Sequence, residues 1–366
     1  MEPIKLGIIG TGQIGKAHIG QYAEISGAKI VALADIDEPE VRRVAEEFGV
    51  SNVYTDFRQL LKRDDVDAVD VCLHNNFHAP VTIAALRAGK HVYCEKPMAG
   101  SYVDAKAMYN AAQECGRKLN IQLSSLFSKE TKVAKRFIEQ GKLGKLYHAR
   151  SAGHRRRGRP FVDGYGTASF VKKEISAGGA LYDMGVYHIA QVLYLLGLPK
   201  VERISGKVYQ ETEMDETRRK SSGYNVEELG IGFVKCAGGL TLDIIEAWAI
   251  HLNRFDGSYV VGSEGGIRLD PFSYHRNLCD VPVDAGADVN GADMRWHRLI
   301  ETESAYDSAQ IHWIAALQGR VPLLPCAEAA LETMLISEGI YLSDKLGREV
   351  TAEEVAGMSK STAVKL

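Results

Sequence analysis

Short apolar runs alternate with amphipathic stretches along the first third of the chain. The runs have the length of buried strands and lie at residues 6–9, 29–33, 68–73, 91–94 and 118–123. Between them, segments such as Val41 to Phe48 and Ala79 to Ala88 carry apolar residues at helical spacing. Strands that alternate with helices in this way predict right-handed βαβ crossovers and a parallel, doubly wound sheet. We therefore expect an α/β domain over residues 1–123.

The pattern changes after Leu123. Alternating apolar and polar positions, typical of half-buried strands, occur at 147–152, 204–210, 225–234 and 240–249. Gly238-Gly239 separates the last two stretches as a hairpin turn would, so we expect an antiparallel sheet. Helical spacing recurs at 132–139, 179–196, 304–317 and 327–342, and a polar tail is expected from Val355. These features predict a second, α+β domain over residues 124–366.

Length and composition agree with this division. A chain of 366 residues favours two domains, because a single core rarely grows beyond roughly 250–300 residues. Basic and acidic residues number 44 and 47, for a formal charge of −3, so we expect neither a nucleic-acid nor a membrane partner. The six cysteines form no CxxC pair, which favours a reducing compartment. With no secretion signal before the first strand, and no apolar run of the roughly 18 residues that span a bilayer, we expect a cytoplasmic protein.

A glycine-rich turn, Gly10-Thr11-Gly12-Gln13-Ile14-Gly15, follows the first apolar run. Between a strand and a helix this spacing is typical of dinucleotide-binding folds. Gly10 allows the tight turn, and Gly15 lets the helix pack closely on the strand. Gly12 lets backbone N–H groups at the helix N-terminus approach a pyrophosphate. We expect Gly10, Gly12, Gln13 and Ile14 to bind the cofactor.

Asp35 ends the second strand, where an adenosine ribose would present its hydroxyls. A carboxylate there accepts hydrogen bonds from a 2′,3′-diol and repels a 2′-phosphate. The sequence therefore predicts NAD as the cofactor, in preference to NADP.

Further polar residues follow the next strands. Asn75 and His78 come after the third apolar run, and Glu95-Lys96-Pro97 comes after the fourth. In an open α/β sheet, ligands bind beyond the carboxyl ends of the strands, so Lys96 is a candidate catalyst and Asn75 and His78 could line the cofactor. The alternative is an ordinary turn with Pro97 at a helix start. His74 and His78 have the spacing of zinc ligands, but no third ligand is evident and we expect no metal.

A third signal lies in the segment from Gly178 to His188. If a helix begins near Ala180, Asp183 and Tyr187 are i, i+4 neighbours with His188 beside them. Carboxylate, phenol and imidazole groups together can form a proton relay. The alternative is that both rings fill a helix–sheet interface.

These motifs together resemble the Gfo/Idh/MocA family, which includes glucose–fructose oxidoreductase and inositol dehydrogenase. The resemblance implies a Rossmann domain, then a domain with a large open antiparallel sheet, and a homodimer or homotetramer formed through that sheet. It also implies that Glu95-Lys96-Pro97 supplies the catalytic lysine and Asp183 the acid. Most members have a histidine four residues after the acid, whereas this chain has Tyr187 there and His188 next. Either ring could accept the proton.

The densest positive charge lies in His154-Arg155-Arg156-Arg157-Gly158-Arg159-Pro160. It resembles a segment of a family branch that acts on sugars or glycosides. Guanidinium groups bind carboxylates, phosphates or paired hydroxyls, so Arg155, Arg156, Arg157 and Arg159 are candidate substrate-binding residues. A solvated loop or a contact between subunits is the alternative.

The leading hypothesis is NAD-dependent oxidation of a ring secondary alcohol in a sugar, glycoside or cyclitol. Lys96 would bind the reacting hydroxyl, with its pKa lowered by burial and by the nicotinamide cation, and Tyr187 or His188 would take the proton. One alternative is a redox-neutral glycosidase or lyase that works through a 3-keto intermediate. A second is a non-catalytic NAD-binding sensor.

Overall fold

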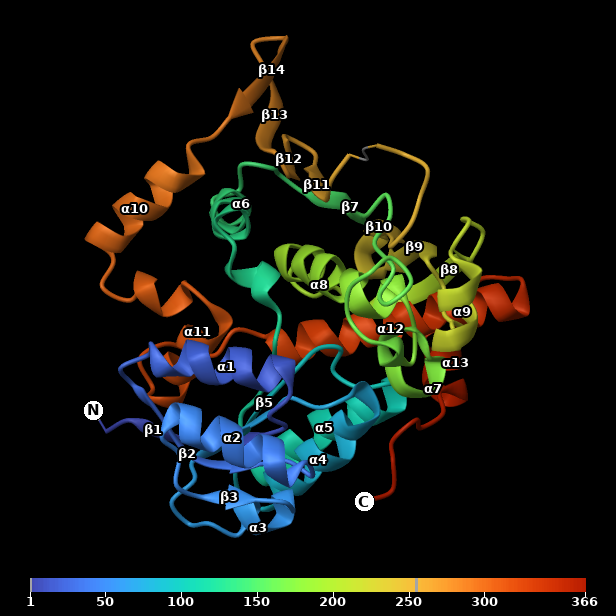
Figure 1. The fold of residues 1–366 in the computed structure, drawn as a ribbon. Coiled ribbons are helices and arrows are strands. Elements are labelled where there is room, and N and C mark those ends of the chain that lie inside the picture. Colours follow the sequence, from blue (N-terminus) through green and yellow to red (C-terminus); the bar gives the residue numbers. More distant parts are fainter. Residues whose placement is uncertain (1, 254–255) are drawn as a thin grey trace.

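The computed structural model describes residues 2–253 and 256–366 and contains two β-sheets (Figure 1). The N-terminal sheet is parallel, with strand order β3-β2-β1-β4-β5-β6, which confirms the doubly wound α/β prediction. Its elements are β1 (Ile4–Ile9), α1 (Gln13–Ala23), β2 (Ala28–Ala34), α2 (Glu38–Phe48), β3 (Val53–Tyr54), α3 (Phe57–Leu61), β4 (Ala68–Val71), α4 (Asn75–Arg87), β5 (His91–Cys94), α5 (Tyr102–Cys115) and β6 (Leu119–Ile121).

The second sheet has nine strands in the order β14-β13-β12-β11-β7-β10-β9-β8-β15. Its strands are β7 (Leu146–His154), β8 (Val201–Tyr209), β9 (Leu229–Cys236), β10 (Thr241–Ala247), β11 (Tyr259–Gly262), β12 (Gly266–Leu269), β13 (Phe272–Leu278), β14 (Val281–Gly286) and β15 (Val350–Thr351). The predicted hairpin at Gly238-Gly239 joins β9 to β10. The sheet is mixed rather than purely antiparallel, because β7 and β10 run parallel at its centre.

The second half of the chain also contains eight α-helices within the described residues. They are α6 (Lys129–Glu139), α7 (Lys173–Ser176), α8 (Val186–Leu195), α9 (Glu216–Ser222), α10 (Val289–Leu299), α11 (Ala309–Leu317), α12 (Cys326–Leu346) and α13 (Ala352–Met358), with short helical turns at Ser124–Phe127, Ala168–Val171, Leu181–Gly185, Ala237–Gly239 and Glu303–Tyr306. Helices α8 and α12 lie between the sheets (Figure 1). Helix α12 packs closely because Gly206 and Gly232, on β8 and β9, leave room for Ile340.

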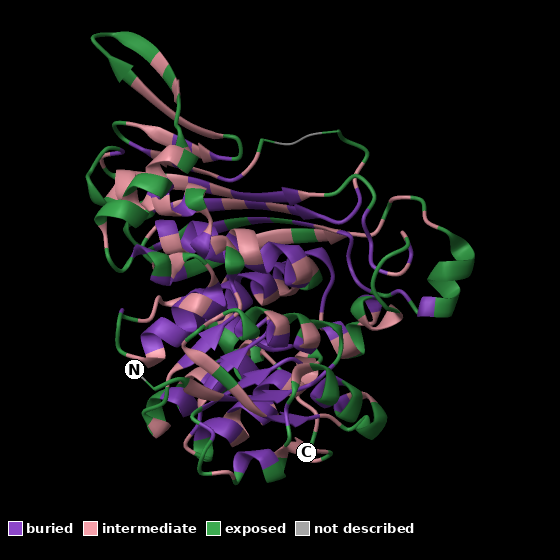
Figure 2. Ribbon diagram, turned by 60° about the vertical axis from the view of Figure 1, so that its left-hand side comes forward, coloured by how far each residue is buried: buried purple, intermediate pink, exposed green. Residues whose placement is uncertain are grey.

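Burial follows this layering. Buried segments fill the parallel sheet and the helices beneath the second sheet, whereas the hairpin of β13 and β14 projects with exposed side chains at its tip (Figure 2). Across the described ranges, no helix is both long enough and apolar enough to cross a membrane.

Two local predictions need correction. The polar tail expected from Val355 is not a loose end: Val355 is buried in α13, and the following residues return to the N-terminal half, where Thr362 N–H donates to Asp104 (2.8 Å) and Val364 N–H to the Asn76 carbonyl (3.1 Å). The helix expected to begin near Ala180 is not α-helical at its start, as described below.

Candidate active site

The glycine-rich turn between β1 and α1 forms an open cradle. Gly10 has a φ of +97°, and a Cβ there would lie 2.3 Å from the Cys72 carbonyl oxygen, so the position requires glycine. A Cβ at Gly15 would lie 2.0 Å from the Gly10 carbonyl oxygen. Gly12 has open space on its Cβ side, and no side chain caps the first turn of α1. The uncapped N–H groups of that turn fit the pyrophosphate of a dinucleotide.

Asp35 follows β2, and its carboxylate is held from one side. Thr11 donates to Oδ2 from its N–H group (2.7 Å) and its hydroxyl (3.1 Å), and Asp37 donates its N–H to Oδ1 (3.0 Å). A carboxylate has about four acceptor positions, so Oδ1 can still accept from a ribose hydroxyl. The next side chain, Ile36, is 92% exposed and offers an apolar surface beside it. These residues fit the adenosine half of NAD.

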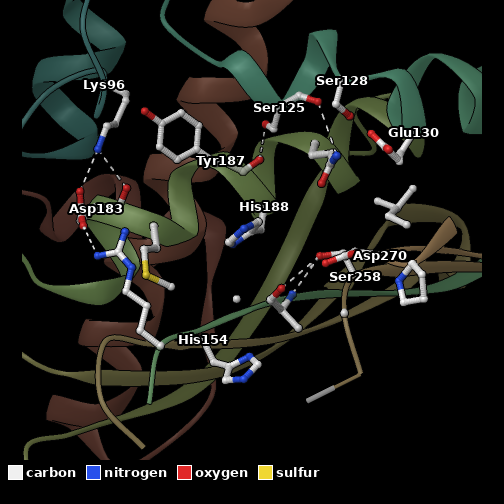
Figure 3. Close-up of a pocket in the computed structure, with 18 residues that line it drawn as sticks. Lys96, Ser125, Ser128, Glu130, His154, Asp183, Tyr187, His188, Ser258 and Asp270 are labelled. Atoms are coloured by element: carbon white, nitrogen blue, oxygen red, sulfur yellow. Dashed lines mark hydrogen bonds and ion pairs between the residues drawn. The ribbon is translucent and has the colours of Figure 1, made fainter. Parts of the chain in front are cut away.

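Lys96 follows β5 and meets Asp183 from the other half of the molecule (Figure 3). Its Nζ donates to Asp183 Oδ1 (2.9 Å) and to the Asp183 carbonyl oxygen (3.1 Å). Asp183 Oδ2 accepts from Trp248 Nε1 (3.0 Å) and lies 3.9 Å from the Arg155 guanidinium. The Lys96 ammonium also lies 5.0 Å from the centre of the Tyr187 ring. Three of the proposed catalytic residues are thus brought together.

The segment that carries Asp183 is a π-helix, η3, over Leu181–Gly185, and α8 follows it directly. The regular α-helical spacing expected from the sequence is therefore wrong here. Both Asp183 and Tyr187 nevertheless reach Lys96. Single π-turns are frequent at functional sites, because they alter which side chains share a face.

Glu227, in the loop before β9, anchors the start of η3. Its buried carboxylate accepts the N–H groups of Gly179 (2.8 Å) and Leu181 (3.0 Å). A Cβ at Gly179 would lie only 1.9 Å from the Glu227 carbonyl oxygen, so this contact requires glycine. Glu227 was not among the residues that the sequence suggested.

The sequence predicted that burial lowers the pKa of Lys96, whereas in the structure this pKa is raised. Burial alone would favour the neutral amine, but the Asp183 carboxylate outweighs burial and raises the pKa of Lys96. Burial likewise opposes ionisation of Asp183, and Lys96 overcomes it to lower the pKa of that carboxyl. Burial raises the pKa of the Tyr187 phenol despite the nearby ammonium. The structure therefore holds a charged Lys96–Asp183 pair beside a neutral phenol.

His188 lies on the same cavity but has a different partner. Its Nδ1 lies 2.9 Å from Glu246 Oε2, and Ser151 donates its hydroxyl to Oε1 of the same carboxylate (3.0 Å). Burial alone would lower the pKa of His188, but Glu246 outweighs it and raises this pKa above 6.5.

These side chains share a cavity of about 1040 Å³ between the sheets. Figure 3 shows Lys96, Asp183 and Tyr187 at one side of it, His188 near the middle, and Ser258 and Asp270 at the other side. Its other polar lining residues are Ser125, Ser128, Glu130, His154, Arg155 and Gln191.

Glu95 is buried and does not line the cavity, and its predicted contact with the cofactor stays a prediction. Its Oε1 lies 2.9 Å from His18 Nε2, and its Oε2 accepts the Lys96 N–H (3.0 Å). His18 Nδ1 lies 2.9 Å from Asp70, and Cys72 Sγ lies 3.4 Å from the same nitrogen. Burial alone would lower the pKa of His18, but Asp70 outweighs it and raises this pKa. The imidazolium therefore balances two buried carboxylates.

His78 and Asn75 also serve the framework. His78 is fully buried, with Nδ1 2.8 Å from the Pro97 carbonyl oxygen and Nε2 2.9 Å from that of Leu73. Both nitrogens face backbone carbonyl oxygens, which argues against the predicted contact of His78 with the cofactor. Asn75 donates its amide to the Ser176 carbonyl (2.8 Å), which links α4 to α7.

The four arginines expected to bind substrate lie in different surroundings. Arg155 lines the cavity. Arg159 is buried and pairs with Asp163 (2.9 Å), and the exposed Arg157 pairs with the same carboxylate (3.0 Å). Arg156 is exposed to solvent. Arg157 and Arg159 thus stabilise the loop, and of the four only Arg155 remains a candidate substrate contact.

Sequence reasoning missed Trp248 and Glu246. Both lie at the end of the alternating stretch that becomes β10, where Leu242, Ile244 and Glu246 share the buried face. A glutamate at an inward position of a strand is a signal that could have been noticed, because buried carboxylates are rare unless paired.

Comparison with known proteins gives this architecture its class. Residues 4–123 match the family model described as "Oxidoreductase family, NAD-binding Rossmann fold", so the first third of the chain is that of an NAD-binding oxidoreductase. Residues 131–268 match the "GFO/IDH/MocA C-terminal domain". The chain belongs to the Gfo/Idh/MocA family, and its cofactor is NAD.

Individual relatives cover most of the chain. D-glucoside 3-dehydrogenase from Escherichia coli (strain K12) is 28% identical over an alignment of 365 positions, which covers 95% of this chain and 97% of that protein. An uncharacterized oxidoreductase from Streptococcus pneumoniae serotype 4 is 31% identical over 275 residues. The match covers 74% of this chain and 69% of that protein. Aldose-aldose oxidoreductase from Caulobacter crescentus, solved with glycerol, shares the fold with a TM-score of 0.75 at 24% identity, over 96% of this chain and 100% of that chain.

Proposed function

We propose that the chain oxidises a secondary alcohol on the ring of a sugar, glycoside or cyclitol. The observation that carries this proposal is the cavity in which Lys96, Asp183 and His188 line one space beside the NAD-binding sheet. The substrate class is supported by the names of two relatives, the D-glucoside 3-dehydrogenase and a myo-inositol 2-dehydrogenase from Thermotoga maritima (strain ATCC 43589 / DSM 3109 / JCM 10099 / NBRC 100826 / MSB8) that is 29% identical over 213 residues. Bound NAD⁺ supplies the hydride acceptor at C4 of its nicotinamide ring.

The residues then divide the proton chemistry. Lys96 stays protonated, so it acts as a hydrogen-bond donor that stabilises negative charge on the reacting oxygen. Asp183, itself held by Trp248, orients the ammonium. His188 accepts the hydroxyl proton at Nε2, because imidazole is a far better base at neutral pH than the buried phenol of Tyr187. Tyr187, which lines the same cavity, would donate its hydroxyl to the bound substrate.

A substrate screen tests this proposal. Sugars, glycosides and inositols are offered with NAD⁺ and NADP⁺ in parallel, and both reduced cofactor and carbohydrate products are measured. We expect reduced cofactor to form with at least one compound, with about tenfold or greater preference for NAD⁺ because the Asp35 carboxylate repels a 2′-phosphate. Carbohydrate turnover without net NADH would instead support the redox-neutral lyase. Tight NAD binding without turnover would support the sensor.

We also propose that the chain forms a homodimer or homotetramer through the open face of the nine-stranded sheet. Ile231 and Phe233 on β9 are 38% and 40% exposed on that face, away from α12. Neighbouring apolar side chains exposed on a sheet favour a protein contact.

A further inference from the structure

The structure places a second carboxylate beneath His188, and its role is separate from that of Asp183. Glu246 is fully buried on β10, and both of its oxygens face donors, from Ser151 and from His188. We propose that Glu246 is a positioning residue that fixes His188 with Nδ1 protonated and Nε2 presented to the substrate. This role rests on the proposed function, since it supposes that His188 meets a reacting hydroxyl.

The neighbouring strand is shaped to admit this pair. Gly153 on β7 is the register partner of Glu246 on β10. A Cβ at Gly153 would lie 2.2 Å from His188 Cε1, 2.4 Å from His188 Nδ1 and 2.6 Å from Glu246 Oε2. Any side chain at this position would displace the imidazole, the carboxylate or both. The glycine therefore leaves the space in which the His188 ring and the Glu246 carboxylate meet.

The hydrogen bond decides which nitrogen is available. A carboxylate accepts only, so Nδ1 of His188 must carry a proton. In the neutral imidazole the lone pair is then on Nε2, on the side of the ring away from Glu246. In a substrate complex, Nε2 takes the hydroxyl proton, and the imidazolium that forms is stabilised by Glu246.

The charges around His188 come from several elements. Burial favours the neutral ring, Glu246 outweighs it, and Arg155 opposes the protonated form. The other charged or titratable groups that line the cavity are Lys96, Glu130, His154, Asp183, Tyr187 and Asp270. Because Asp183 is committed to Lys96 and Trp248, Glu246 is the carboxylate bonded to His188.

The first test uses Glu246→Gln and needs no substrate. Imidazole ¹⁵N NMR of the NAD-free protein, with His188 assigned by His188→Asn, should show Nδ1–H in the parent protein. In Glu246→Gln the His188 titration should move to lower pH by about one unit or more, since a neutral amide replaces the charge. An unchanged titration and tautomer would overturn the positioning role.

The second test uses activity and a matched glycine pair. Gly153→Ala should lower kcat by about tenfold to 1,000-fold, by displacing His188 without removing any polar group. Gly266→Ala, on β12 of the same sheet, meets its nearest neighbour at 3.6 Å and should keep the parent kcat. The acid limb of kcat should follow the NMR titration in Glu246→Gln, and Glu246→Asp should restore it in part. Equal kcat in both glycine variants, with folding confirmed, would contradict the proposal.

The two tests separate this inference from the proposed function. If the NMR result holds but no carbohydrate is oxidised, the proposed function fails while the Glu246–His188 arrangement stands. If carbohydrates are oxidised with an acid limb that ignores Glu246, the proposed function stands and the positioning role fails. Should Glu246→Gln not fold, Gly153→Ala takes its place in the NMR test, because its Cβ would lie 2.4 Å from His188 Nδ1 and 2.6 Å from Glu246 Oε2 and so displaces this contact.

Discussion

Lys96 and Asp183 each keep the other charged in a buried setting. Burial opposes both charges, and the charge of each group is what keeps its partner ionised. An ammonium held in this way cannot accept a proton, and that duty passes to another residue. Lys96 is therefore suited to stabilise an oxyanion rather than to act as a base.

Replacing Lys96 by Met should lower kcat by about 10²–10⁴-fold, because the donor to the reacting oxygen is lost. NAD affinity, measured by fluorescence titration, should change little, since the cradle at Gly10–Gly15 is untouched. Lys62→Met, at an exposed lysine after α3, is the matched control. A near-normal kcat in folded Lys96→Met would show that Lys96 is only a turn residue.

Asp183→Asn should change how stability depends on pH. The folded-state pKa of Asp183 is below the unfolded value of 3.8, so its ion pair contributes stability that is fully present above pH 3.8 and is lost as the pH falls below it. Urea unfolding should therefore separate the variant from the parent protein at pH 7, with the parent more stable, and the difference should shrink at pH 3. Asp64→Asn, at an exposed site, serves as control. An equal gap at both pH values would contradict this account.

At the scale of elements, strands that are buried on both faces were the easiest to predict from the sequence. Strands β1, β2, β4, β5 and β6 were recognisable because they lie in apolar runs, whereas the two-residue strand β3 (Val53–Tyr54) was not predicted. Strands β13 and β14 and helix α10 gave no prediction, because their side chains are mostly half-buried or exposed and their periodicity is weak. The π-turn at η3 depends on Glu227, which lies far along the chain from Gly179, so no local pattern could reveal it.

The site was predictable to a similar degree. Lys96 and Asp183 each lie within a recognisable local motif, and the structure brings the two side chains into contact. Charge density alone misled for Arg157 and Arg159, because their partner Asp163 folds back within the same loop. Local sequence patterns cannot predict contacts between strands that lie far apart in the chain.

Gly179→Ala tests the anchoring of η3. The new Cβ would collide with the Glu227 backbone, so the start of η3 must shift and carry Asp183 away from Lys96. We expect a loss of about 1–3 kcal/mol in the free energy of unfolding and a fall in kcat, with NAD affinity kept. Gly357→Ala in α13, where a Cβ meets nothing within 4 Å, is the control. Parent-like kcat and stability would show that η3 tolerates the shift.

At the scale of the whole molecule, helix packing and hydrogen bonds hold the two halves together, in addition to the chain connection between them. Helix α12 packs against both α5 and β8, and the residues after α13 bind Asp104 and Asn76 in the N-terminal half. The Lys96–Asp183 bond crosses the same junction. The cavity is therefore complete only when both halves are docked.

Phe233→Asp tests the proposed assembly. A charge on the open face of the nine-stranded sheet should oppose an apolar contact and shift the protein toward monomers. Size-exclusion chromatography with light scattering would measure the change. Leu299→Asp, at an 80% exposed leucine on α10, is the control and should leave the distribution unchanged. Identical distributions in parent and Phe233→Asp would remove this face from consideration.

The Lys96–Asp183 contact across the junction has a consequence for how such a protein can diversify. One half supplies the NAD cradle and the lysine, and the other supplies the carboxylates and most of the cavity wall. Substitutions in the second half can thus alter which compound is accepted without rebuilding the redox apparatus. A chimera that grafts a different nine-stranded half onto residues 4–123 would inherit the donor's substrate preference, provided the graft returns an acid to the place where Lys96 meets it.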